Sequence, residues 1–118
     1  VEEVSATGPE TFDRVYGESA DRVRSGLLGL HPDLEQWTQA FAYGRVLARG
    51  RLTLLERELL AVAILTVLGR LEEPLLGHMR AAVRLGASPE DVAAVIRAVP
   101  PVGRESDREA ALALLSRL

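Results

Sequence analysis

The longest apolar run in the chain, LLAVAILTVLG at residues 59–69, constrains the fold more than any other feature. The run is about half as long as the roughly 20 residues that span a bilayer, so we expect a buried helix and not a membrane anchor. A helix over roughly Leu54 to Gly69 would be apolar nearly all round beyond its first turn, and such a helix must be covered on every side. A chain of 118 residues offers few neighbours to do so. We therefore predict that further copies of the chain cover part of it, in a homo-oligomer.

The other segments also carry helix signals, and no segment shows the alternation that is typical of a strand. A Ser or Thr followed three residues later by an acid marks a helix start as a capping box, while glycine and proline mark helix ends. We expect an all-α fold, a single domain over residues 1–118 with about six helices, and frayed residues 1–8. The signals predict helices from Thr7–Glu10 to Gly29, from Pro32 to near Arg49-Gly50, from Thr53 to Gly69, from after Arg70 to Gly86, from Ser88 to the break at 99–103, and from Ser106 onwards.

Composition excludes several classes of function. Apolar residues make up 47% of the chain and charged residues 26%, which is the balance of a folded globular domain. The net charge is -3 and no block of basic residues occurs, so we do not expect nucleic-acid binding. There is no cysteine, which removes disulfides, thiolate metal sites and thiol redox chemistry. We expect no metal or other cofactor and no membrane partner, and, since no signal segment opens the sequence, a cytoplasmic protein.

His78 is an ionisable residue among leucines. It shares one stripe of the helix expected before Gly86 with other residues at helical spacing, namely Leu71, Leu75, Ala82 and Leu85. We therefore expect the ring to point toward the interior. Spacing alone leaves two interpretations open: a core histidine bonded to a backbone carbonyl, or a proton-transfer group.

Glu58 is equally unexpected, because it lies on one side of the long apolar helix with Leu54, Leu55, Val62 and Leu65. A carboxylate among leucines must find a partner or take up a proton. One alternative is an ion pair with Arg57, Arg49 or Arg51 at a subunit boundary. The other is a contact with His78 between packed helices, which would form a pair able to move a proton near neutral pH.

Two segments resemble the carboxymuconolactone decarboxylase family, which includes the AhpD-like alkylhydroperoxidases. They read AYGRVLARGRLTLLERELLAVAILTVLGR at 42–70 and HMRAAVRLGASPEDVAAVIRAVPPVG at 78–103. The most telling pieces are Tyr43-Gly44 before a basic turn, Leu-x-x-x-Glu-Arg-Glu-Leu at 52–59, and Gly86-x-Ser-Pro-Glu-Asp. The similarity covers roughly Pro32 to Leu118. It implies an all-helical AhpD-like fold that assembles as trimers or hexamers.

The peroxidase branch of that family carries a glutamate, a Cys-x-x-Cys motif and a histidine three residues later, and relays protons to and from the thiols. The resemblance places Glu58 at the glutamate, if one residue is inserted near Leu71, and His78 at the histidine. The two cysteines would fall at about Leu71 and Pro74. Thiol peroxidase chemistry by this chain alone is therefore not expected.

The decarboxylase branch lacks the cysteine pair and uses a histidine in the helix that here holds His78, acting on a lactone that bears carboxylates. The resemblance therefore implies that His78 protonates the carbon that loses carbon dioxide, with Glu58 orienting the ring. Arg57, Arg80 or Arg84 could bind substrate carboxylates, although each such arginine is commonly a solvated surface charge. Arg80 and Arg84 are expected to face away from the stripe of His78.

Two hypotheses about function follow. The first is a carboxymuconolactone decarboxylase-like lyase that acts on a small carboxylated molecule. The second is a non-enzymatic helical oligomer of the same family that serves in binding or assembly, with Glu58 and His78 as a relic polar pair. An open pocket that reaches His78 would favour the first hypothesis, and a sealed core would favour the second.

Overall fold

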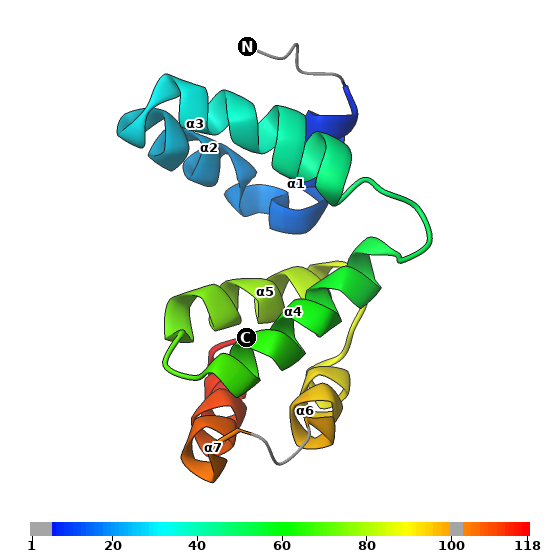
Figure 1. Ribbon diagram of the computed structural model, residues 1–118, viewed down its shortest axis with the longest axis vertical. Coiled ribbons are helices and arrows are strands. Elements are labelled where there is room, and N and C mark those ends of the chain that lie inside the picture. The colour runs from blue at the N-terminus through cyan, green and yellow to red at the C-terminus, as the bar shows by residue number, and fades with distance from the viewer. Residues whose placement is uncertain (1–5, 100–102) are drawn as a thin grey trace. The chain divides into compact units, whose positions relative to one another are not determined.

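The computed structural model of the protein describes residues 6–99 and 103–118. Within these ranges the regular structure is entirely helical, so the prediction of an all-α fold is confirmed (Figure 1). The chain divides into two compact units, residues 1–54 and 55–118. Thr7 and Gly8 already belong to the first helix, so the expected fraying does not extend to them.

The first unit contains α1 (Thr7–Tyr16), the 3-10 turn η1 (Gly17–Ser19), α2 (Ala20–Leu30), α3 (Pro32–Trp37) and the π-helix η2 (Thr38–Val46). The expectation of one helix from Thr7–Glu10 to Gly29 is wrong, because the chain breaks at Gly17, where φ is +56°. The next helix begins at Pro32 as predicted. The His31 side chain caps it, since its Nδ1 atom accepts the backbone N–H of Asp33 at 3.1 Å.

α1 packs on the π-helix through two glycines. A Cβ atom at Gly8 would overlap the Gln39 carbonyl oxygen, and one at Gly44 would lie 2.9 Å from the same atom. Only glycine allows backbones to approach this closely. The neighbouring core of this unit is aromatic: Phe12 is fully buried, and the Tyr43 hydroxyl donates to the Tyr16 hydroxyl at 2.9 Å.

The second unit contains α4 (Leu54–Leu68), α5 (Glu72–Arg84), α6 (Pro89–Ala98), α7 (Glu105–Ala113) and the 3-10 turn η3 (Leu114–Arg117). α4 begins directly after Thr53, as the capping-box pattern predicts. It ends before Gly69, where φ is +71°, and α5 ends before Gly86, where φ is +118°. Both glycines adopt a conformation that other residues rarely take, which confirms the predicted helix ends.

Two predicted caps have different outcomes. The capping box at Ser88 is confirmed, because its hydroxyl accepts the Asp91 N–H at 3.0 Å and the Asp91 carboxylate accepts the Ser88 N–H at 2.9 Å. The cap at Ser106 is wrong: α7 begins at Glu105, and Arg104 stands at its N-cap without a side-chain hydrogen bond. Ser106 therefore lies inside the first turn and not at the N-cap. In the predicted break at 99–103, Val99 and Gly103 lie outside helices, and residues 100–102 lie outside the described residues.

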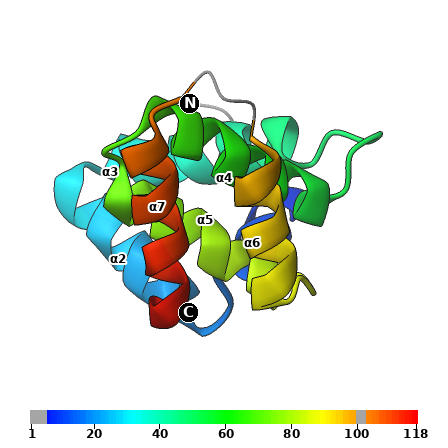
Figure 2. The same cartoon turned by 90° about the horizontal axis from the view of Figure 1, so that it is seen from below.

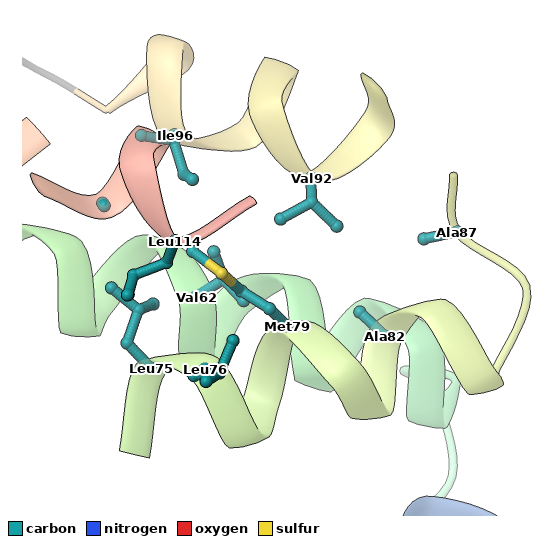
Figure 3. Close-up of a cluster of buried hydrophobic side chains, with 10 residues drawn as sticks. Val62, Leu75, Leu76, Met79, Ala82, Ala87, Val92, Ile96 and Leu114 are labelled. Carbon is teal, nitrogen blue, oxygen red and sulfur yellow. The ribbon is translucent and has the colours of Figure 1, made fainter. Parts of the chain in front are cut away.

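Figure 2 shows the ribbons of α5, α6 and α7, and the core side chains of the second unit lie between α5 and its neighbours (Figure 3). Leu76 and Met79 of α5 are completely covered, and they meet Val92 and Ile96 of α6. Val62 from α4 joins the cluster, as Figure 3 shows. Burying side chains of this size stabilises a domain by about 1.5–3 kcal/mol each, so this cluster holds α4, α5 and α6 together.

α4 is only partly covered within the chain. Its buried positions follow one another at steps of four, and on the other side Leu60, Ile64 and Leu68 are 52%, 51% and 65% exposed. The helix has no polar face that would account for this exposure. Among the described residues, no helix is both long and apolar enough to cross a membrane. The prediction that further copies cover α4 stays a prediction.

Candidate functional site: a buried glutamate and a half-exposed histidine

Glu58 and His78 touch each other across α4 and α5. The Nδ1 atom of His78 lies 2.5 Å from Oε2 of Glu58, which is a short, charge-assisted hydrogen bond. The side chain of Glu58 is 3% exposed, whereas that of His78 is 42% exposed. The pair therefore connects the interior of the second unit with its surface.

The position of Glu58 follows from the register of α4. Leu54, Glu58, Val62 and Thr66 repeat at steps of four and are all buried, so they form the inner face of the helix. A carboxylate on this face needs a partner. Within the described part of the chain that partner is His78, as the second of the two alternatives for Glu58 requires.

His78 lies at the border of the buried face of α5 and not at its centre. The expectation that the ring points into the interior is therefore only partly right. Leu76 and Met79 on the adjacent stripe are fully covered, whereas on the stripe of His78 Leu75 and Ala82 are buried but Leu71 is 37% exposed. Because His78 is bonded to a carboxylate, the interpretation of a core histidine held by a backbone carbonyl is wrong.

The contact assigns different tasks to the two ring nitrogens. An ionised Glu58 only accepts hydrogen bonds, so the Nδ1 atom of His78 carries a proton and donates it to Oε2. The Nε2 atom is then the nitrogen that can release or take up a proton. A buried carboxylate that orients a half-exposed imidazole in this way is suited to general acid–base chemistry.

The structure does not bring Arg80 and Arg84 to the histidine. Both are exposed on α5, and at 100° per residue they project about 200° and 240° round the helix from His78. The Arg80 guanidinium donates to the Arg117 carbonyl at 3.1 Å. Arg57 is half-buried and directly precedes Glu58 on α4, so it is the one of the three arginines that lies next to a member of the pair in the chain.

A small hollow lies near the start of α5. It has a volume of about 150 Å³, and its lining includes Leu71 and Leu75, the second of which stands one turn before His78. His78 itself is not part of that lining, so this hollow is not the open pocket at the ring that would favour the lyase hypothesis. Leu71 is also one of the two positions at which the resemblance places a cysteine of the peroxidase branch.

Sequence reasoning missed Asp107, which lines the same hollow from α7. A Cβ atom at Gly69 would lie 2.5 Å from the Asp107 carboxylate. The glycine therefore ends α4 and also lets the Asp107 side chain lie close to the backbone. In the sequence, Gly69 is the only feature that could have pointed to Asp107. A glycine at this position predicts a helix end, but it does not predict which side chain packs against it. Among the described residues, no cluster of three potential metal ligands occurs.

Comparison with known protein families assigns the chain to a family. The model of the carboxymuconolactone decarboxylase family matches residues 32–116, from the first residue of α3 to the turn η3. The matched region includes both Glu58 and His78. The chain therefore belongs to the carboxymuconolactone decarboxylase family. None of the curated proteins compared with the chain matches it.

Proposed function

We propose that the protein is a carboxymuconolactone decarboxylase-like lyase in which His78 is the general acid–base and Glu58 positions it. The observation that carries the proposal is the 2.5 Å contact between Nδ1 of His78 and Oε2 of Glu58. In a purely structural pair, both side chains would be expected to be buried, whereas here the His78 imidazole is 42% exposed. The absence of cysteine leaves proton transfer as the chemistry that the pair can perform.

The reaction would begin with a small substrate that carries a carboxylate next to a lactone or a similar carbonyl. Its C–CO₂ bond breaks, carbon dioxide leaves, and the electron pair stays on the substrate, delocalised into the carbonyl group. The protonated Nε2 atom of His78 then donates its proton to that carbon, and the ring regains a proton from solvent. Throughout, Glu58 holds Nδ1–H and stabilises the charged ring, so Nε2 keeps its direction.

The substrate anion also needs a cation. Of the three arginines, Arg57 projects about 100° round α4 from Glu58, while Arg80 and Arg84 lie on the side of α5 away from the ring. A guanidinium binds a carboxylate through two parallel hydrogen bonds, which would orient the substrate as well as attract it. We therefore propose Arg57 as the residue that binds the substrate carboxylate.

The second candidate is a non-enzymatic oligomer of the same family. The apolar face of α4 supports it, because Leu60, Ile64 and Leu68 are each at least half exposed within one chain. In this alternative the Glu58–His78 pair only joins α4 to α5, and its loss would change stability without changing any reaction.

Carbon dioxide release distinguishes the two candidates. The wild type is first screened by thermal shift against small di- and tricarboxylates and carboxylated lactones, carboxymuconolactone among them, and compounds that bind are tested for decarboxylation. We expect His78→Asn to lower kcat by about 100-fold or more, the usual contribution of a general acid. Glu58→Gln should lower kcat less, because the amide oxygen still accepts Nδ1–H but no longer stabilises the charged ring.

His31→Asn is the matched control. His31 is an exposed histidine that caps α3, and asparagine caps helices equally well, so this variant should keep the wild-type rate. If no compound in the panel releases carbon dioxide, or if His78→Asn works as fast as the wild type, the lyase proposal fails and the second candidate is favoured.

A further inference from the structure

An apolar hollow lies between α4 and α6, away from the Glu58–His78 pair. It has a volume of about 430 Å³ and is lined by apolar residues alone, among them Ala63, Ile64, Val67 and Leu68 from α4 and Val95 and Ala98 from α6. This volume falls within the range of about 300–1,000 Å³ that small-molecule sites occupy. A hydrocarbon body of a ligand would gain about 0.8 kcal/mol for each methylene group that it buries there.

A polar hollow of about 360 Å³ adjoins the apolar one. The two share Val67 and Leu68, so the apolar lining continues into a lining that includes Arg70, Arg104 and Asp107. Within the described ranges, neither the Arg70 nor the Arg104 guanidinium makes a hydrogen bond or an ion pair. The apolar and the polar hollow together are called the double hollow. Two positive charges against one negative charge make its polar end attractive to an anion.

The backbone at Arg70 is unusual as well. Its φ is +60°, a left-handed conformation that a residue with a Cβ atom rarely adopts. Left-handed non-glycine residues are found preferentially at functional sites. The strain coincides with one of the two cations at the polar end of the double hollow.

We propose that this double hollow binds a free monocarboxylic acid with an aliphatic body. Its hydrocarbon would occupy the α4–α6 hollow, and its carboxylate would lie between Arg70 and Arg104. The occupant is a small molecule because the apolar lining ends in two cations that no acidic side chain of the described residues pairs with. An apolar interface with a second copy would leave those cations unexplained.

This site is distinct from the proposed catalytic pair. Ile64 and Val67 project about 120° and 180° round α4 from Glu58, and Leu68 lies ten residues or about 15 Å further along the helix. The inference therefore does not depend on the lyase proposal. Binding can be measured by calorimetry without any turnover.

The hydrocarbon part is tested with a series of straight-chain acids from hexanoate to decanoate, each titrated below its micelle-forming concentration into the wild-type protein. We expect saturable binding whose affinity rises on the order of fourfold per methylene until the hollow is full. Ala98→Trp places an indole in the hollow from the exposed last residue of α6 and should abolish binding. Ala113→Trp is the matched control, since Ala113 is the exposed last residue of α7 and should leave binding unchanged.

The carboxylate part is tested by comparing decanoate with its methyl ester. The wild type should prefer the acid by about tenfold, the value of one charge-assisted hydrogen bond. Arg70→Gln and Arg104→Gln should each reduce this preference. Arg97→Gln is the control, because Arg97 is an exposed arginine of α6 that lines neither hollow.

Three results would overturn the inference. The first is equal binding of decanoate by the wild type and by Ala98→Trp, or no binding by either. The second is an oligomer that disperses on Ala98→Trp in gel filtration while decanoate gives no heat with the wild type, which would assign the face to a second copy. The third is flotation with anionic phospholipid vesicles without any binding of the free acids.

Discussion

The Glu58 carboxylate and the His78 ring share a 2.5 Å hydrogen bond although one is buried and the other is half exposed. This asymmetry decides what each residue can do. The carboxylate cannot reach water and needs the ring to compensate its charge, whereas the ring can exchange protons through its Nε2 atom. The two histidines of the chain are consequently held in opposite ways, and that difference can be measured.

The neutral rings of His78 and His31 should adopt opposite tautomers. An ionised Glu58 accepts a hydrogen bond from Nδ1 of His78, whereas Nδ1 of His31 itself accepts from the Asp33 backbone N–H. Two-bond ¹⁵N–¹H spectra at a pH where both rings are neutral should therefore show His78 protonated at Nδ1 and His31 protonated at Nε2. In Glu58→Leu the signals of His78 should lose this preference while those of His31 stay in place. Identical tautomers in the wild type would contradict the contact.

Removing only the histidine of the pair should cost more stability than removing both residues. His78→Leu leaves a buried carboxylate without a partner, and we expect the free energy of unfolding to fall by about 3 kcal/mol. The double variant with Glu58→Leu and His78→Leu has no buried charge and should recover most of that loss. Urea denaturation of the wild type, both single variants and the double variant provides the measurement. Additive losses would mean that the two residues do not interact.

The packing of α1 on the π-helix gives a comparison of two glycines. Gly8→Ala would place a Cβ atom against the backbone oxygen of Gln39, and we expect a loss of about 2 kcal/mol or more in the free energy of unfolding. Gly26→Ala in α2 meets no atom within 4 Å and should stabilise the protein by about 0.5–1 kcal/mol. Thermal or urea unfolding of both variants tests this difference in sign. A Gly8→Ala protein as stable as the wild type would show that α1 does not approach the π-helix so closely.

The two serines with capping patterns should respond differently to alanine. Ser88→Ala removes the hydrogen bond to the Asp91 N–H and should cost about 1 kcal/mol in the free energy of unfolding. Ser106→Ala removes no cap, because α7 begins at Glu105, so its effect should stay within about 0.5 kcal/mol. Urea denaturation of both variants provides the comparison. Similar losses in the two would mean that α7 begins only after Ser106, with that serine as its N-cap.

The sequence predicted helix ends better than it predicted helix interiors. Gly69 and Gly86 end helices because their backbone conformation is open to glycine, and this is a local property that a sequence displays. The π-helix after Trp37 has no such local signal, and the residue that packs closely against its Gln39, Gly8, lies about thirty residues earlier in the chain. Local patterns therefore fail where a distant segment determines the backbone.

The sequence likewise predicted part of the candidate site, namely the contact between its two residues, but not the orientation of the helix that carries His78. Glu58 stood out because an acid without a cap role lay on an apolar face, and the structure pairs it with His78. The orientation of α5 was harder to predict, because the stripe with His78 and the stripe with Met79 are similarly apolar and differ by only one residue in register. The choice between them depends on which stripe meets α6, and this is a tertiary contact that helical periodicity does not contain.

The exposed face of α4 leads to the last prediction, which concerns assembly. Leu60 is 52% exposed and continues the stripe of Ile64 and Leu68, so a single chain leaves a row of large apolar side chains in water. We expect light scattering to give the mass of a trimer or a hexamer at micromolar concentration. Leu60→Arg should lower that mass, because it places a charge within the apolar contact. Ile64 and Leu68 also line the α4–α6 hollow, whereas Leu60 does not, so a contact over this row would compete with the acid and the Leu60→Arg variant should bind decanoate at least as tightly as the wild type. A monomeric wild type would contradict the assembly and would leave the apolar face of α4 to another partner.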